Sequence, residues 1–181
     1  MSRAPVRPAL ASKVEIAPLE REQWQLLKQL RIAALADSPD AFGPTAEDAR
    51  SRPDSYWQTW ASRLDADLGL ALFVLTIEGE PSGLVSATKD RAGIGHIGAM
   101  WVAPAARGGR FGSRLLDRAL DFLGQTGCRT IELSVTEGNA GPLSLYRSRG
   151  FALTGRSEPL REGSSLRNLF MRIERDPAHT G

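Results

Sequence analysis

The sequence predicts a single-domain mixed α/β fold, in which helices flank a β-sheet. Three observations support this prediction. The 181 residues match the ~100–200 residues of one domain. Hydrophobic residues make up 41% of the chain and charged residues 24%, which are the proportions of a globular protein. Apolar residues recur at strand and helix spacing in the order strand, two helices, three strands, helix, strand, helix and two strands, which predicts a mixed sheet.

The first half of the chain begins with a strand and two helices. Val14, Ile16 and Pro18 indicate a short strand. Apolar residues at helical spacing predict an amphipathic helix from Glu20 to about Ala36, which the loop beginning at Asp37-Ser38-Pro39 ends. A second helix is expected near residues 46–63, broken or started by Pro53. Its aromatic side chains recur at helical spacing, which favours a core role over contact with a ligand: Tyr56, Trp57 and Trp60.

The remaining elements are further strands and two more helices. A helix over Ser113–Leu123 carries its apolar residues on one face and ends at Gly124 and Gly127. Pro142 lies in the first turn of the other helix, which Gly150 closes. The strands are predicted at Ala71–Ile77, Gly83–Thr88, His96–Val102, Thr130–Val135, Phe151–Thr154 and Leu166–Ile173.

Cysteine content and hydropathy exclude several classes of protein. Cys128 is the only cysteine, which excludes intramolecular disulfides and a cysteine-cluster zinc site. No apolar run approaches the ~18 residues of a membrane span, and the start at Met1–Pro5 lacks the apolar stretch of a signal peptide. We therefore expect a cytoplasmic protein with no membrane partner. Residues 1–13 are expected to form a loose leader, residues 14–175 the domain and residues 176–181 a polar tail.

Charge is unevenly distributed along the chain, although the net charge is only +2. Residues 1–100 carry 11 basic and 13 acidic side chains, whereas residues 101–181 carry 12 and 8. Nearly all of the basic residues are arginines, whose planar guanidinium offers paired donors to phosphate. The small positive excess of the second part does not indicate nucleic acid, and it favours a small phosphorylated ligand.

A glycine-rich turn from Val102 to Ser113 connects a predicted strand to a predicted helix. Such a loop presents unpaired backbone N–H groups and the positive end of the helix dipole to an anion. Its glycines let the backbone approach an anion closely. The segment lacks the Gly-Lys-Ser/Thr end of a P-loop and the G-x-G-x-x-G pattern of a dinucleotide fingerprint. On the turn alone, a plain connector with solvated arginines remains the alternative.

A second motif follows the next strand and runs from Asn139 to Phe151, with the sequence NAGPLSLYRSRGF. Together with the turn, it resembles the GNAT superfamily of N-acetyltransferases, which pair an R/Q-x-x-G-x-G/A turn with a downstream N-x-x-A-x-x-L-Y-x-x-x-G-F helix. The resemblance extends from about Val14 to Ile173, and the stretch from Arg31 to Gly43 looks like one large bacterial branch. It implies a mixed, mostly antiparallel sheet flanked by helices and a reaction that uses acetyl-CoA.

The resemblance also implies a cofactor site. The segment Arg107–Ser113 would hold the pyrophosphate of coenzyme A, and the backbone of Met100 and Val102 would pair with the pantetheine arm. A nearby backbone N–H would polarise the thioester carbonyl, and Asn139 and Tyr146 would line the thioester end. No metal is expected. The expected cofactor-binding residues are Met100, Trp101, Val102, Arg107, Gly108, Gly109, Arg110, Phe111, Gly112, Ser113, Asn139 and Tyr146.

Two side chains are candidates for catalysis. The Tyr146 hydroxyl is a weak acid that a cleft can position to protonate the departing thiolate, and the alternative is a core tyrosine. His96 begins a strand beside the expected cleft, and an ordinary pKa near ~6.5 suits proton removal from an ammonium, with a structural histidine as the alternative. Gly98 stands where many family members carry a glutamate base, so ordered water is a third candidate for this step. Arg110 fills a position often held by glycine and would add a phosphate contact.

We therefore expect transfer of an acetyl group from acetyl-CoA to a primary amine of a small molecule or a protein. Direct attack in a ternary complex is expected, because no cysteine nucleophile lies near either motif. The alternative is a non-catalytic acyl-CoA-binding or sensing module, which would keep the turn but lack a base at Gly98. We expect a monomer or homodimer without a nucleic-acid partner. The sequence carries no recognisable code for the acceptor amine.

Overall fold

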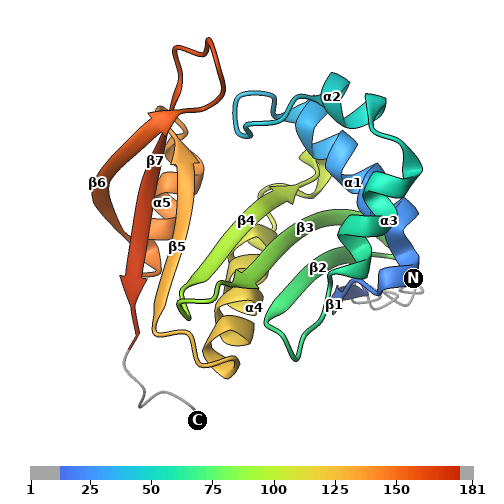
Figure 1. Ribbon diagram of the computed structural model, residues 1–181, viewed down its shortest axis with the longest axis horizontal. Coiled ribbons are helices and arrows are strands. Elements are labelled where there is room, and N and C mark those ends of the chain that lie inside the picture. Colours follow the sequence, from blue (N-terminus) through green and yellow to red (C-terminus); the bar gives the residue numbers. More distant parts are fainter. Residues whose placement is uncertain (1–12, 176–181) are drawn as a thin grey trace, which may run out of the picture.

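A seven-stranded sheet forms the centre of the computed structural model, which describes residues 13–175 (Figure 1). The strand order is β1-β2-β3-β4-β5-β7-β6, and every neighbouring pair is antiparallel except β4 and β5. The mixed, mostly antiparallel sheet expected from the sequence is confirmed. The strands are β1 (Val14–Pro18), β2 (Leu70–Ile77), β3 (Glu80–Lys89), β4 (Gly95–Val102), β5 (Thr130–Thr136), β6 (Ala152–Pro159) and β7 (Arg167–Glu174).

Helices cover both faces of the sheet (Figure 1). One face carries α1 (Trp24–Asp37), α2 (Ala46–Ser51) and α3 (Asp54–Ser62), and the other carries α4 (Phe111–Gln125) and α5 (Ala140–Ser148). Short 3-10 helices precede α1 (Arg21–Gln23) and α4 (Pro104–Ala106). Within the described range, no helix is both long and apolar enough to cross a membrane.

Two apolar clusters lie on the two faces of the sheet, and β2 contributes to both. Phe73 and Leu75 join the cluster under α4, whereas Leu72 and Val74 join the cluster under α1 and α3. Successive side chains of a strand point to opposite faces, so a strand covered on both sides must be apolar throughout. This explains the uninterrupted run of apolar residues from Leu70 to Leu75 in β2.

Most predicted elements agree with the structure to within a few residues. The expected break near Pro53 is confirmed, since α2 ends at Ser51 and α3 begins at Asp54. The β2–β3 turn is tighter than predicted, because Glu78 and Gly79 both have positive φ (51° and 85°) and let β3 begin at Glu80. The predicted tail at 176–181 lies outside the described residues, as does the predicted leader apart from Lys13.

The strands β4 and β5 separate after a short parallel contact. They pair only at Gly95 with Ile131 and at His96 with Glu132. Beyond this point the two strands diverge, which opens the sheet between its two halves (Figure 1). A β-bulge with Ala99 at a φ of 51° further distorts the free end of β4. The divergence places that end of β4 beside the starts of α4 and α5.

Candidate active site

A cavity of about 580 Å³ lies at the opening between β4 and the starts of α4 and α5. Four segments line it: the loop after α1, the end of β4, the turn into α4 with its first residues, and the first turns of α5. Its lining residues are Ser38, Ala41, Phe42, Met100, Trp101, Val102, Ala106, Arg107, Gly108, Arg110, Phe111, Gly112, Ser113, Asn139, Gly141, Pro142, Leu145 and Tyr146. The structure thus brings together all of the expected cofactor-binding residues except Gly109.

The turn into α4 has the backbone geometry of an anion-binding loop. Gly108 and Arg110 both have positive φ (85° and 59°), and α4 begins at Phe111 without a side-chain cap. The first N–H groups of a helix have no partner within the helix, so they are available to an anion beside the turn. Gly109 does not line the cavity, but the turn needs glycine here, because a Cβ would lie 2.4 Å from the Phe111 ring.

Gly112 in the first turn of α4 sets the width of the cavity. A Cβ at this position would meet Leu145 Cδ2 at 3.6 Å and Met100 Cε at 3.7 Å, which are ordinary van der Waals distances. The helix therefore tolerates a small side chain here. Such a side chain would fill the space between β4 and α5.

Tyr146 in α5 and Asn139 just before it bring polar side chains to the cavity. Tyr146 is 7% exposed, and burial raises the pKa of its hydroxyl to about 12, so it stays protonated at neutral pH. This hydroxyl lies 4.0 Å from Met100 Sδ, and its ring packs edge to face against Phe151. Asn139 is the residue that precedes α5. Tyr146 is therefore a buried core residue, as the alternative expected, that also lines the cavity.

Arg107 and Trp101 both donate to the Asp37 carboxylate, which was not among the site residues expected from the sequence. The Arg107 guanidinium forms a salt bridge with Asp37, the last residue of α1, and its Nε donates to the Val102 carbonyl at 3.1 Å. Trp101 Nε1 also donates to Asp37, at 2.8 Å. Arg110 makes no salt bridge among residues 13–175, so it is the turn arginine that remains available to an anion.

His96 lies outside this cavity. It sits at the closed end of the opening, where β4 and β5 still pair, and its Nε2 is 3.0 Å from Asp90 Oδ2. The hydrogen bond with His96 is the main cause that lowers the pKa of Asp90. Glu132 on the adjacent strand pairs with Arg172 at 2.6 Å. The structure therefore does not bring His96 to Tyr146, and we leave His96 out of the proposed mechanism.

The loop after α1 is the part of the cavity wall that sequence reasoning missed. Phe42 lines the cavity, and the buried Arg31 guanidinium lies 5.1 Å from the centre of its ring. From the opposite half of the sheet, Arg161 donates to the carbonyls of Pro39 and Phe42 at 3.0 and 3.2 Å. The resemblance of the stretch from Arg31 to Gly43 to a bacterial branch of the family was the only feature of the sequence that could have pointed to this loop.

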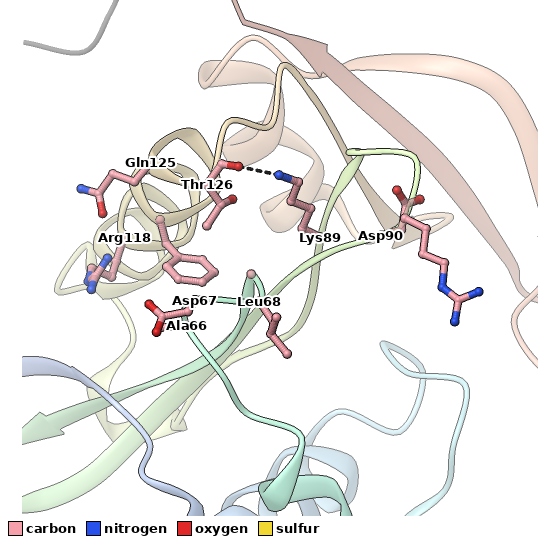
Figure 2. Close-up of a pocket in the computed structure, with 11 residues that line it drawn as sticks. Ala66, Asp67, Leu68, Lys89, Asp90, Arg118, Gln125 and Thr126 are labelled. Carbon is pink, nitrogen blue, oxygen red and sulfur yellow. Dashed lines mark hydrogen bonds between the residues drawn. The ribbon is translucent and has the colours of Figure 1, made fainter.

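A second cavity, of about 780 Å³, lies at the far end of α4 (Figure 2). Two of its three lining cations contact other groups, and the third, Arg91, is exposed: Lys89 donates to the Thr126 carbonyl at 2.6 Å (Figure 2), and the Arg118 guanidinium lies 4.1 Å from the centre of the Phe73 ring. This cavity meets the end of α4 that carries the negative pole of the dipole. Although it is larger, it lacks the free helix N-terminus of the first cavity, which we take as the candidate active site.

Comparisons with known proteins agree with this geometry. The model of the acetyltransferase (GNAT) family matches residues 30–151. A mycothiol acetyltransferase from Stackebrandtia nassauensis is 33% identical over 135 residues, which cover 72% of this chain and 41% of that protein. A streptothricin acetyltransferase from Streptomyces lavendulae is 32% identical over 127 residues, which cover 70% of this chain and 61% of that protein. The chain therefore spans less than two thirds of these curated relatives.

Solved structures share the fold at low sequence identity. The yncA protein from Salmonella typhimurium, determined with its cofactor acetyl-CoA, has a TM-score of 0.75 at 21% identity, with 91% of this chain and 95% of that chain covered. A ribosomal-protein-alanine N-acetyltransferase from Brucella melitensis has a TM-score of 0.72 at 21% identity, with coverages of 88% and 99%. With the family model matching more than half of its residues, the chain belongs to the GNAT acetyltransferase family.

Proposed function

We propose that this protein transfers an acetyl group from acetyl-CoA to the primary amine of a small molecule or a protein. One observation carries the proposal: a single cavity joins an uncapped helix N-terminus to a buried, protonated tyrosine, Tyr146. The first feature suits a pyrophosphate and the second suits a leaving thiolate. The names of the relatives and the acetyl-CoA complex of the yncA protein support the same reaction.

The residues of the cavity fit coenzyme A by their chemistry. The first N–H groups of α4 and Arg110, which has no salt bridge within the described residues 13–175, offer donors and positive charge to the pyrophosphate. The distorted end of β4, from Met100 to Val102, offers backbone groups to the amides of the pantetheine arm. The Val102 carbonyl already accepts one hydrogen bond from Arg107 and keeps a second lone pair. Acetyl-CoA would supply the activated thioester.

In the proposed reaction, the neutral amine nitrogen attacks the thioester carbonyl and forms the new C–N bond. The C–S bond then breaks, and the thiolate leaves with the electron pair. A thiol has an ordinary pKa of ~8.5, whereas burial raises the pKa of Tyr146 to about 12, so the tyrosine is the weaker acid. Tyr146 therefore acts by donating a hydrogen bond to the sulfur. The proton that the attacking nitrogen loses reaches the sulfur through the same hydroxyl.

Removal of the first proton from the acceptor ammonium is assigned to ordered water. Gly98 offers no side chain for this step, and His96 is bound to Asp90 at the closed end of the opening. The enzyme would then contribute mainly by orienting the reactants and polarising the carbonyl. The rate should rise with pH until the acceptor amine itself is neutral.

The alternative function is a non-catalytic acyl-CoA-binding or sensing module, which the absence of a side chain at Gly98 favours. An assay that follows release of the free coenzyme A thiol with a panel of amines separates the two. Binding of acetyl-CoA without release of thiol on any amine would favour the sensing module. A cytoplasmic location and a monomeric or homodimeric state remain predictions from the sequence.

Binding itself is tested by thermal shift with coenzyme A and acetyl-CoA. A ligand at 100 times its dissociation constant adds ~2.7 kcal/mol to the free energy of unfolding. We expect a clear rise in Tm with both ligands. The absence of a rise would contradict the proposed phosphate-binding turn and, with it, both candidate functions.

A further inference from the structure

One carboxylate oxygen of Asp37 joins three segments of the chain. Its Oδ2 accepts hydrogen bonds from the Ser38 hydroxyl at 2.7 Å, from Trp101 Nε1 at 2.8 Å and from the Arg107 guanidinium. Asp37 ends α1, Trp101 belongs to β4 and Arg107 opens the turn into α4. Burial opposes ionisation of Asp37, but the bonds from Trp101, Ser38 and Arg107 outweigh it and lower the pKa, so the carboxylate is charged at neutral pH.

Both long-range partners of Asp37 hold backbone that the cofactor is proposed to contact. Trp101 follows the β-bulge and lies between Met100 and Val102, and its side chain is only 8% exposed. Arg107 reaches from the turn to both Asp37 and the Val102 carbonyl. The end of β4 and the start of the turn are therefore fixed to α1 through one carboxylate. Without it, neither the indole N–H nor the guanidinium has another acidic partner among residues 13–175.

We propose that Asp37 is a positioning residue for acetyl-CoA, acting through Trp101 and Arg107. This inference rests on the proposed function. It also changes the role of Arg107, which the family resemblance assigned to the pyrophosphate. The guanidinium of Arg107 anchors the turn to α1, and the pyrophosphate is left to the helix N-terminus and Arg110.

The test measures binding of acetyl-CoA by calorimetry to the full chain and to four variants. Asp37→Asn keeps the side-chain volume and removes the charge, Arg107→Gln removes the other half of the salt bridge, and the double variant removes both. Loss of a charge-assisted hydrogen bond should weaken binding about tenfold in each single variant. Because the two residues act as one unit, the double variant should bind no more weakly than the single variants.

The matched control is Asp54→Asn. It removes an equivalent carboxylate from an exposed salt bridge, in which Lys28 Nζ lies 2.7 Å from Asp54 in α3. This residue lies outside the cavity, so acetyl-CoA affinity should not change. With an amine that the wild type acetylates, Asp37→Asn should raise the KM for acetyl-CoA and leave the KM for the amine unchanged.

Three results would overturn the inference. Normal affinity in Asp37→Asn with weak binding in Arg107→Gln would mean that Arg107 contacts the pyrophosphate directly. A lower Tm of Asp37→Asn with unchanged affinity for acetyl-CoA would mean that Asp37 stabilises the fold without positioning the cofactor. Failure of the wild type itself to bind acetyl-CoA would overturn both the inference and the proposed function. If Asp37→Asn does not fold, Trp101→Phe removes the indole donor alone and must weaken binding for the inference to stand.

Discussion

Replacing Arg31 with methionine should stabilise the protein. The Arg31 side chain is 6% exposed, and its Nη1 has no hydrogen-bond partner among residues 13–175. Its closest charge-stabilising contacts are the rings of Phe42 and Trp60, whose centres lie 5.1 and 5.9 Å from the guanidinium carbon. A buried charge without an anionic partner destabilises a folded protein. Methionine is unbranched and apolar, and it adapts to the space left by the longer arginine chain.

The magnitude follows from the pKa of this guanidinium. Burial lowers the pKa from 12.5 to about 10, and each pKa unit corresponds to ~1.36 kcal/mol, so burial of the charge costs ~3 kcal/mol. The rings of Phe42 and Trp60 are only partly buried, so each of the two cation–π contacts returns ~1 kcal/mol. The net cost of the charge is therefore ~1 kcal/mol. Removing it should raise Tm by ~2–4 °C in a chain of this size.

Thermal and urea denaturation of the wild type and Arg31→Met measure this difference. The control is Arg52→Met, because Arg52 is exposed and its guanidinium lies 5.0 Å from the Tyr56 ring, so a change within ~0.5 kcal/mol is expected. A lower Tm for Arg31→Met would refute the reasoning, since the aromatic contacts would then outweigh the cost of burial. A stabilised variant with a raised KM for the amine would show that the charge is kept to hold Phe42 against the cavity.

Four further predictions follow from the site. Tyr146→Phe should lower kcat at least tenfold with unchanged acetyl-CoA affinity, because it removes the hydroxyl that bonds to the leaving sulfur and relays the proton. Proton transfer of this kind is typically worth ~10²–10⁴-fold, and the lower end applies because a thiolate leaves readily. Undiminished turnover would exclude the donor role. Gly112→Val should abolish acetyl-CoA binding with little change in Tm, and normal binding would make the turn a plain connector. His96→Ala should leave the pH–rate profile unchanged, whereas loss of an inflection from that profile would identify His96 as the base. The pKa of Asp37 is lower in the folded state, so the ionised carboxylate stabilises the fold fully above the unfolded pKa of ~3.9. This stabilisation is lost as pH falls through the folded pKa. In urea titrations, the free energy of unfolding of Asp37→Asn should therefore fall less with acid than that of the wild type.

Much of the fold could be predicted because its signals are local. The apolar face of α4 recurs every three or four residues, and the predicted bounds Ser113–Leu123 lie within two residues of the observed Phe111–Gln125. Pro53 separates α2 from α3, as expected of a residue that lacks a backbone N–H. The turn into α4 and the start of α5 were also predicted, because each carries a dense motif that is contiguous in the sequence.

The position of His96 could not be predicted, because it depends on where β4 and β5 part. The sequence placed His96 correctly near the start of a strand. Which end of that strand opens toward a ligand is decided by the pairing of His96 with Glu132 and by the bulge at Ala99. Both are set by strand register between segments distant in the sequence. His96 was therefore expected beside the cleft, whereas it lies at the closed end of the opening.

Asp37 shows how a local conflict can point to a distant contact. Read locally, Asp37-Ser38-Pro39 is only a helix stop, and its partners Trp101 and Arg107 lie 64 and 70 residues further along the chain. A carboxylate in the last turn of a helix faces the negative end of the dipole, which costs ~0.3–1 kcal/mol. α1 has no basic residue in its last turn to offset this cost. Donors from other elements offset this cost in Asp37, together with the local Ser38 hydroxyl: they are the indole of Trp101 in β4 and the guanidinium of Arg107 in the turn into α4.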